Sequence, residues 1–187
     1  PLRDFIHDPR FEPVRQLVGH DARIGDREKD GLVINRFVNV PGSVYRRLGW
    51  HTDGLRDIFY GRMPQRMLNV GLHLDRIGPE DGALCLIPGT HTQGLLSMLL
   101  GKPHFVGHTP DPREVCVHTE PGDLTIHDGR LWHRVRRSQR TGALSERRTL
   151  YVPYLTGPYE PKTDDSPTPG YHRLGRAMRA AKALSPL

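Results

Sequence analysis

The sequence of 187 residues has few cysteines and few aromatic residues. Its two cysteines, Cys85 and Cys116, form no CxxC pair and no other spacing that is typical of a zinc site. We therefore expect neither a disulfide nor a structural metal at these positions. Both cysteines are interpreted as small apolar packing residues of a protein in the reducing cytoplasm.

Long hydrophobic runs are also absent. No apolar stretch approaches the roughly 18 residues that a membrane-spanning helix needs, and the N-terminus has no secretory apolar region. The composition therefore argues against a membrane protein and favours a cytoplasmic one. A chain of this length fits one domain, residues 1–187, whose core is large enough to need no disulfide or structural metal.

Acidic residues are fewer than basic ones, and the formal net charge is +6. The basic residues do not form one dense block, and their tightest group is Arg134, Arg136 and Arg137. No zinc finger, RRM or KH signature accompanies them, so nucleic acid is not the expected partner. An excess of positive charge favours an anionic small-molecule substrate instead.

Glycine and proline are abundant, with 20 and 17 copies spread along the chain, as is typical of many short strands joined by turns. We predict a mainly β protein with a few short helices and a jelly-roll core over about residues 32–156. A C-terminal tail and short helix occupy 157–187. The predicted strands are 32–40, 67–74, 83–87, 115–119, 124–128 and 148–154, and the predicted helices are 94–100 and 174–184.

The predicted strand 67–74 alternates clearly between apolar and polar residues. Successive side chains of a strand point to opposite faces. One face therefore carries Leu68 and Val70, continued by Leu72 and Leu74, and the other face carries Asn69, Gly71 and His73. This strand is expected to have one apolar and one more polar side.

The sharpest local feature is the pair His51 and Asp53. On an extended segment, residues i and i+2 point to the same side, so both side chains can reach one metal ion. Two histidines and one carboxylate that bind one metal leave open positions, as in non-heme Fe(II) oxygenases. With 11 histidines and 21 acidic residues, however, such a pair also arises by chance.

Two histidines compete for the place of the third ligand. His127 lies in the predicted strand 124–128 and faces away from Leu124 and Ile126, whereas His133 follows a turn at Gly129 and begins the next extended stretch. We favour His133 and keep His127 as the alternative.

Arg147 and Arg148 follow further along the chain. A guanidinium matches the two oxygens of a carboxylate. Because the two arginines are adjacent on a predicted strand, one is expected to face the pocket and the other solvent.

Together these segments resemble the phytanoyl-CoA dioxygenase family of 2-oxoglutarate-dependent oxygenases. The similarity extends over about residues 32–154. It includes residues 49–54 (GWHTDG), the strand 67–74, residues 80–91 (EDGALCLIPGTH), residues 121–128 (PGDLTIHD), residues 131–133 (LWH) and residues 147–150 (RRTL). The resemblance implies a double-stranded β-helix, another name for this jelly roll.

The resemblance also implies roles for individual residues. It assigns Fe(II) to His51, Asp53 and His133, and the distal carboxylate of 2-oxoglutarate to Arg147, with Arg148 as the alternative. It gives His91 no catalytic role.

The activity implied is a dioxygenase that uses Fe(II), 2-oxoglutarate and O2. Because the acidic ligand Asp53 is present, we expect hydroxylation of a C–H bond in an anionic or acyl-type small molecule, with desaturation, epoxidation or cyclisation as variants. Arg47, Asn69 and Arg56 are candidate pocket residues. The alternative is a non-catalytic or differently metallated cupin-like module that binds an acidic partner.

Overall fold

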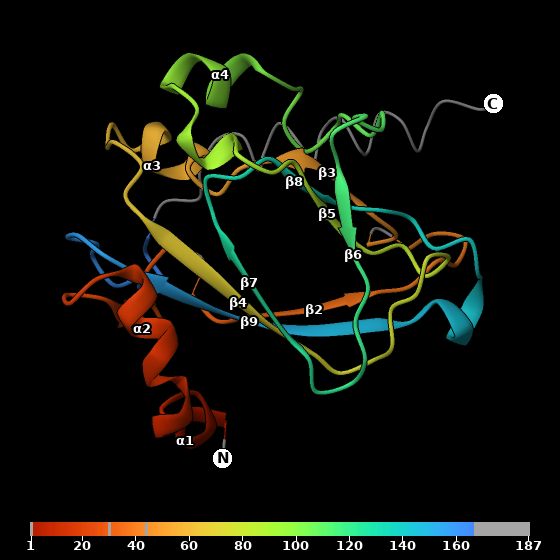
Figure 1. The fold of residues 1–187 in the computed structure, drawn as a ribbon, viewed down its shortest axis with the longest axis horizontal. Helices are drawn as coiled ribbons and strands as arrows, with labels where there is room; N and C mark the ends of the chain where they lie inside the picture. Colours follow the sequence, from red (N-terminus) through yellow and green to blue (C-terminus); the bar gives the residue numbers. More distant parts are fainter. Residues whose placement is uncertain (1, 30, 44, 167–187) are drawn as a thin grey trace.

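A computed structural model describes residues 2–29, 31–43 and 45–166. Two antiparallel sheets face each other, and strands far apart in the sequence lie side by side in each (Figure 1). Sheet A has the order β1-β9-β4-β7, with β2 also paired to β9, and sheet B has the order β3-β8-β5-β6. The strands of sheet A are β1 (Arg23–Ile24), β2 (Val33–Phe37), β4 (Met67–His73), β7 (Leu124–Asp128) and β9 (Arg147–Leu155). Those of sheet B are β3 (Leu48–His51), β5 (Leu84–Leu86), β6 (Val115–Val117) and β8 (His133–Val135).

The helices are short, as expected. The predicted helix 94–100 is confirmed as α4, and the predicted helix 174–184 lies outside the described residues. Within the described part of the chain, no helix has the length and apolar character needed to cross a membrane. The helices are α1 (Leu2–Ile6), α2 (Glu12–Val18), α3 (Leu55–Phe59) and α4 (Leu95–Leu100), and the 3-10 turns are η1 (Pro9–Phe11), η2 (Thr90–Thr92) and η3 (Gly142–Ser145).

The main hydrophobic core lies between α1, α2 and the outer face of sheet A. The alternation of β4 places Leu68 and Val70 in this core, as predicted, and burying such a side chain contributes about 1.5–3 kcal/mol. Polar residues of β4 are therefore turned toward sheet B. The buried members of this core are Ile6, Val14, Val18, Ala22, Leu68, Val70, Leu150, Val152 and Tyr154.

A second, smaller core covers the outer side of sheet B and consists of Trp50, Ile87 and Trp132. The indole N–H of Trp50 donates a 2.8 Å hydrogen bond to the carbonyl of Thr109. The Arg134 guanidinium lies 5.1 Å from the centre of the Trp50 ring, within the range of a cation–π contact. Trp50 and Trp132 each neighbour a histidine of the site described below, so this core fixes the backbone beside both.

Cys85 and Cys116 form a disulfide, so the prediction of two unpaired packing residues was wrong. Cys85 on β5 lies directly opposite Cys116 on β6 in the strand register. Cross-strand neighbours are close enough for their side chains to react. The pairing depends on this register, which a sequence separation of 31 residues does not reveal.

Candidate metal centre

A β-bulge in β3 sets the direction of the His51 side chain. Leu48 pairs with Val135 of β8, but the next pair is His51 with His133, so β3 contains one extra residue between these pairs. Shifting a strand by one residue moves a side chain to its other face. The bulge therefore places His51 on the inner face beside His133, and turns Trp50 to the outer core.

Two glycines allow the chain to pass close to its neighbours around this bulge. A Cβ on Gly49 would lie 2.4 Å from the carbonyl oxygen of Phe105, which is too close for any side chain. The loop that carries Phe105 can thus hydrogen-bond to Trp50, and the Phe105 ring stacks on His51 at 5.0 Å. On the other side, a Cβ on Gly54 would lie 2.8 Å from the sulfur of Met98 in α4.

His51, Asp53 and His133 come together at one point between the sheets. Each offers one ligand atom, and these atoms lie within 4.8 Å of one another. The His133 Nε2 atom lies 3.9 Å from Asp53 Oδ1, and the two imidazole centres are 4.0 Å apart. His51 and His133 are only 6% and 5% exposed. The group matches the two-histidine, one-carboxylate donor set expected from the sequence.

Backbone carbonyls fix the tautomer of both histidines. Nδ1 of His51 lies 2.8 Å from the carbonyl oxygen of Gly49, and Nδ1 of His133 lies 2.9 Å from that of Leu131. A carbonyl oxygen only accepts hydrogen bonds, so each Nδ1 must carry the proton. Each Nε2 is then left with a free lone pair for a metal, as is usual for metal-binding histidines whose other ring nitrogen donates a hydrogen bond.

The electrostatic surroundings keep His51 neutral. Burial, and then the neighbouring His133, hold the pKa of His51 well below the ordinary value of 6.5. A metal binds the neutral imidazole, so no proton has to be displaced from this side chain at neutral pH. This chemistry fits a divalent transition metal.

His127, the alternative ligand, lies close by but outside the ligand group that the structure brings together. It belongs to β7 on the opposite sheet, and its ring centre is 5.1 Å from that of His133. Its side chain is 7% exposed, and its Nδ1 atom has no hydrogen-bond partner among the described residues. Burial and the neighbouring His133 also lower the pKa of His127 well below 6.5.

The polar face of sheet A lies beneath these ligands. Asn69 of β4 donates a 2.6 Å hydrogen bond from Nδ2 to Oδ2 of Asp53. A Cβ on Gly71 would lie 2.7 Å from the ring of Tyr151, so the missing side chain makes room for this phenol. Burial, and then the charge of Asp53, raise the pKa of Tyr151. We did not anticipate Tyr151, although alternation along β9 places it on the same face as Arg147.

The two adjacent arginines differ as predicted in their burial. Arg147 is 3% exposed and reaches from β9 to sheet B, where it donates hydrogen bonds to the carbonyls of Gly82, Arg136 and Arg46. Burial lowers its pKa to about 10, and its Nε atom has no partner among the described residues. Arg148 points outward and forms an ion pair with Asp75 at 2.7 Å.

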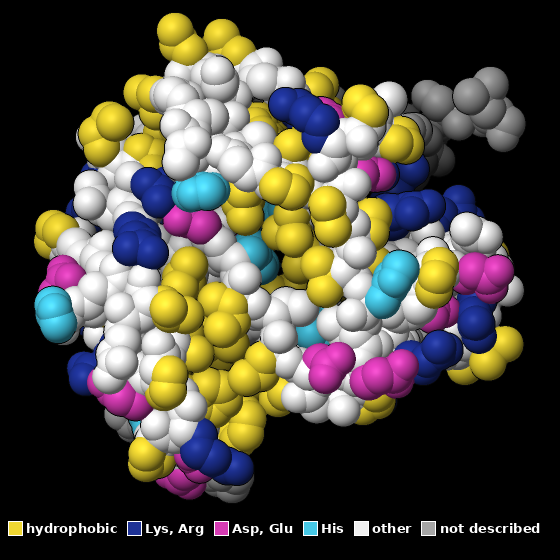
Figure 2. Space-filling view, viewed as in Figure 1, with side chains coloured by type: hydrophobic (Ala, Val, Ile, Leu, Met, Phe, Trp, Pro, Cys, Tyr) yellow, Lys and Arg dark blue, Asp and Glu magenta, His cyan; other side chains and the backbone are white. Residues whose placement is uncertain are grey.

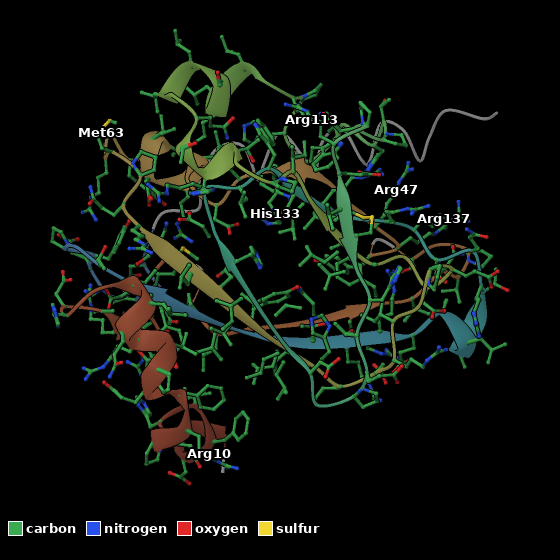
Figure 3. All side chains as sticks on the ribbon, viewed as in Figure 1. Arg10, Arg47, Met63, Arg113, His133 and Arg137 are labelled. Atoms are coloured by element: carbon green, nitrogen blue, oxygen red, sulfur yellow. A yellow bond between two sulfur atoms is a disulfide. The ribbon has the colours of Figure 1, made fainter. Side chains whose placement is uncertain are left out.

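The other candidate pocket residues are divided by the structure. Asn69 lies at the site, whereas Arg47 is exposed on the side of the molecule that also carries Arg137, away from His133 (Figure 3). Partial desolvation, and then the positive charges of Arg137 and Arg134, lower the pKa of Arg47. Arg56 lies over the ring of Tyr60, with its guanidinium carbon 5.7 Å from the ring centre. Arg47 therefore lies apart from the three ligands, and its role in a substrate pocket stays a prediction.

One face of the molecule is hollowed between the two sheets, and histidine side chains lie deep in this hollow beside hydrophobic ones (Figure 2).

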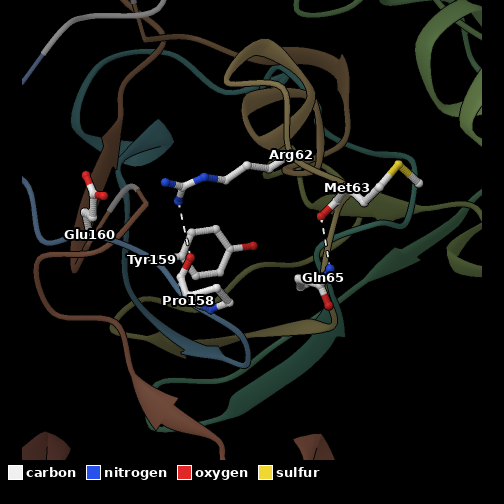
Figure 4. Close-up of a pocket in the computed structure, with 6 residues that line it drawn as sticks. All are labelled: Arg62, Met63, Gln65, Pro158, Tyr159 and Glu160. Atoms are coloured by element: carbon white, nitrogen blue, oxygen red, sulfur yellow. Dashed lines mark hydrogen bonds between the residues drawn. The ribbon is translucent and has the colours of Figure 1, made fainter.

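A separate groove with a volume of about 410 Å³ lies between the segment after α3 and residues 158–160, and it contains none of the three ligands (Figure 4). The groove is lined by Arg62, Met63, Gln65, Pro158, Tyr159 and Glu160.

The sequence matches the family model for phytanoyl-CoA dioxygenase (PhyH) over residues 4–141, which is more than half of the chain. The chain belongs to the phytanoyl-CoA dioxygenase family. This match confirms the resemblance described above. No curated protein matches the chain.

Solved structures with the same fold include two that contain bound 2-oxoglutarate. The epimerase SnoN, in complex with Fe3+, α-ketoglutarate and nogalamycin RO, has a TM-score of 0.64 at 18% identity, covering 90% of this chain and 67% of its own. HygX from Streptomyces hygroscopicus, with nickel and 2-oxoglutarate bound, has a TM-score of 0.56 at 22% identity, and the match covers 82% of this chain and 65% of HygX. The chain spans only 33% of EvdMO1, a further similar structure with a TM-score of 0.57 and 20% identity that covers 83% of this chain. These likenesses confirm the jelly-roll fold.

Proposed function

We propose that this protein is an Fe(II)- and 2-oxoglutarate-dependent oxygenase that oxidises a C–H bond of a small-molecule substrate. The observation that carries the proposal is the meeting of His51, Asp53 and His133, whose ligand atoms lie within 4.8 Å of one another in a buried setting. Membership of the phytanoyl-CoA dioxygenase family supports the choice of iron, because a donor set alone does not select a metal.

The protein's own groups orient the site before any ligand arrives. The carbonyls of Gly49 and Leu131 hold both imidazoles with Nε2 directed at a common point. Ferrous iron with 2-oxoglutarate, held there, would supply the oxidising power through its reaction with O2. The chain contributes binding, orientation and the exclusion of water, which the burial of both histidines supports.

Arg147 is the proposed anchor for the distal carboxylate of 2-oxoglutarate. Its guanidinium is buried over the Phe37 ring, its hydrogen bonds go to neutral carbonyls, and its Nε has no hydrogen-bond partner among the described residues. A buried cation that lacks a carboxylate partner favours an anionic ligand. The net charge of +6 agrees with an anionic co-substrate and favours an anionic or acyl-type substrate.

Anaerobic titration tests the proposal directly. Purified protein is expected to bind Fe(II), and to bind 2-oxoglutarate more tightly in the presence of the metal. Incubation in air with small-molecule substrates is expected to release succinate only when Fe(II) and 2-oxoglutarate are both present. Protein that binds neither ligand would contradict the proposal, and a preference for zinc or manganese without succinate release would favour a differently metallated cupin-like module.

A further inference from the structure

The carboxylate of Asp53 has two oxygens with different surroundings. Oδ1 faces the ligand group, 3.9 Å from Nε2 of His133. Oδ2 accepts a 2.6 Å hydrogen bond from Asn69. This bond is short for an N–H···O contact, as is usual when the acceptor carries a charge. Because a carboxylate only accepts hydrogen bonds, it is the amide nitrogen of Asn69 that faces it.

Gly129 encloses the same oxygen from a second direction. A Cβ on Gly129 would lie 3.1 Å from Oδ2, and the Gly129 carbonyl accepts a 2.8 Å hydrogen bond from the backbone N–H of Asp53. Backbone and side chain of Asp53 are therefore both fixed, and Oδ2 is held toward sheet A by contacts that do not involve the histidines.

Asn69 is itself held firmly on β4. Its neighbours in sequence, Leu68 and Val70, are buried in the main core, and its neighbours across the sheet are His127 on β7 and Pro153 on β9. The strand therefore fixes the backbone of Asn69, from which the amide reaches Asp53. The position of the group that holds Asp53 thus depends on the packing of sheet A.

We propose that Asn69 is a positioning residue that makes Asp53 bind the metal through one oxygen only. The inference rests on the metal centre proposed above. By holding Oδ2, Asn69 leaves Oδ1 alone for the metal, so that three protein atoms occupy one face and three positions stay open. Without this hydrogen bond, Oδ2 can turn to the metal as a fourth protein donor. One open position would then be lost.

The test compares two substitutions that remove the donor. Asn69→Leu has a similar size and no hydrogen-bonding group, and Asn69→Asp keeps the shape but replaces the donor with an acceptor. The matched control is Asn35→Leu, because Asn35 lies on β2 of the same sheet, opposite Thr149. Thermal unfolding of the metal-free proteins shows whether each variant folds.

Two readouts separate positioning from a general loss of structure. Crystals of the nickel-loaded Asn69→Leu protein with 2-oxoglutarate are expected to show both oxygens of Asp53 on the metal, whereas the wild type and Asn35→Leu show one. In the Fe(II) proteins, succinate formation is expected to fall about 10- to 100-fold in both Asn69 variants, the usual cost of losing a residue that hydrogen-bonds to a metal ligand. The affinity of the nickel-loaded proteins for 2-oxoglutarate is expected to change little.

The inference is overturned if Asp53 still binds through one oxygen in Asn69→Leu, or if succinate formation is unchanged in both Asn69 variants. An equal fall in the Asn35→Leu control would also overturn it, because the effect would then not depend on Asp53. Wild-type protein that binds neither nickel nor Fe(II) would refute the metal centre itself, and this result is distinct from the others.

Discussion

Replacing His133 with alanine should remove most of the stabilisation that a metal gives to this fold, whereas replacing His127 should not. The ligand atoms of His133, His51 and Asp53 lie within 4.8 Å of one another, and His127 is not part of that group among the described residues. His127 belongs to β7, opposite Asn69, so it cannot take the place of His133 unless that strand moves.

The size of the effect follows from mass action. Nickel at 100 times its dissociation constant stabilises a protein by about 2.7 kcal/mol. For a chain of this length, each kcal/mol shifts the unfolding temperature by about 2–4 °C, so the wild type should gain about 5–11 °C. If losing this ligand weakens nickel binding by about 100-fold, as much as losing a residue that holds a ligand in place can cost, the same nickel concentration equals the new dissociation constant. The gain then falls to about 0.4 kcal/mol, or about 1–2 °C.

The assay is thermal unfolding followed by circular dichroism, with and without nickel, for the wild type, His133→Ala and His127→Ala. Each variant is compared with itself, because removing a buried imidazole also changes the stability of the metal-free protein. A full nickel-induced shift in His133→Ala, or its loss in His127→Ala, would refute the assignment of the third ligand.

Three further outcomes are expected. Arg147→Gln should weaken 2-oxoglutarate binding to the nickel-loaded protein about 10- to 100-fold, since a hydrogen bond to a charged group contributes about 1.5–3 kcal/mol. Arg148→Gln should leave this binding unchanged. Titration calorimetry that shows equal losses in both variants would contradict the role of Arg147 as the 2-oxoglutarate anchor. Cys116→Ser should lower the free energy of unfolding by about 3–4 kcal/mol, the value expected for a closed loop of about 30 residues; a reductant should do the same to the wild type and leave the variant unaffected. The side chain of Arg113, and then that of Lys102, hold the pKa of Asp111 below its ordinary value of 3.8, so the stabilisation from the charged Asp111 is present above pH 3.8 and is lost as the pH falls through the lower folded value. The difference in unfolding temperature between wild type and Asp111→Asn should therefore shrink below pH 3.8. A difference that stays constant with pH would contradict the assignment of this stabilisation to the Asp111 charge.

Strand alternation predicted from sequence much of what faces the site. The pattern around Leu68 and Val70 indicated which side of β4 is buried in the core, and so which side carries Asn69. The predicted segment 124–128 agrees with β7 residue for residue. These strands are paired on both sides or packed on one face, so their period of two is visible in the sequence.

Features that depend on tertiary contacts could not be predicted in this way. The bulge between Leu48 and His51 adds one residue to β3, which pairs with β8 and also hydrogen-bonds to the Phe105 loop through Trp50. Cys85 and Cys116 meet through strand register alone. The choice between Arg147 and Arg148 likewise follows from register, since Arg147 pairs with Phe37 and turns inward.

The two sheets contribute different parts of the site, and this explains why the site is sensitive to packing far from it. The donor atoms come from sheet B and the turns beside it, whereas the group that holds Asp53 comes from sheet A. Their relative position is therefore determined by how the sheets pack, and for Asn69 by the burial of its neighbours Leu68 and Val70 under α1 and α2. A core substitution such as Val70→Ala, which leaves a cavity without touching any polar group, should thus loosen the contact between Asn69 and Asp53 as well as lower stability.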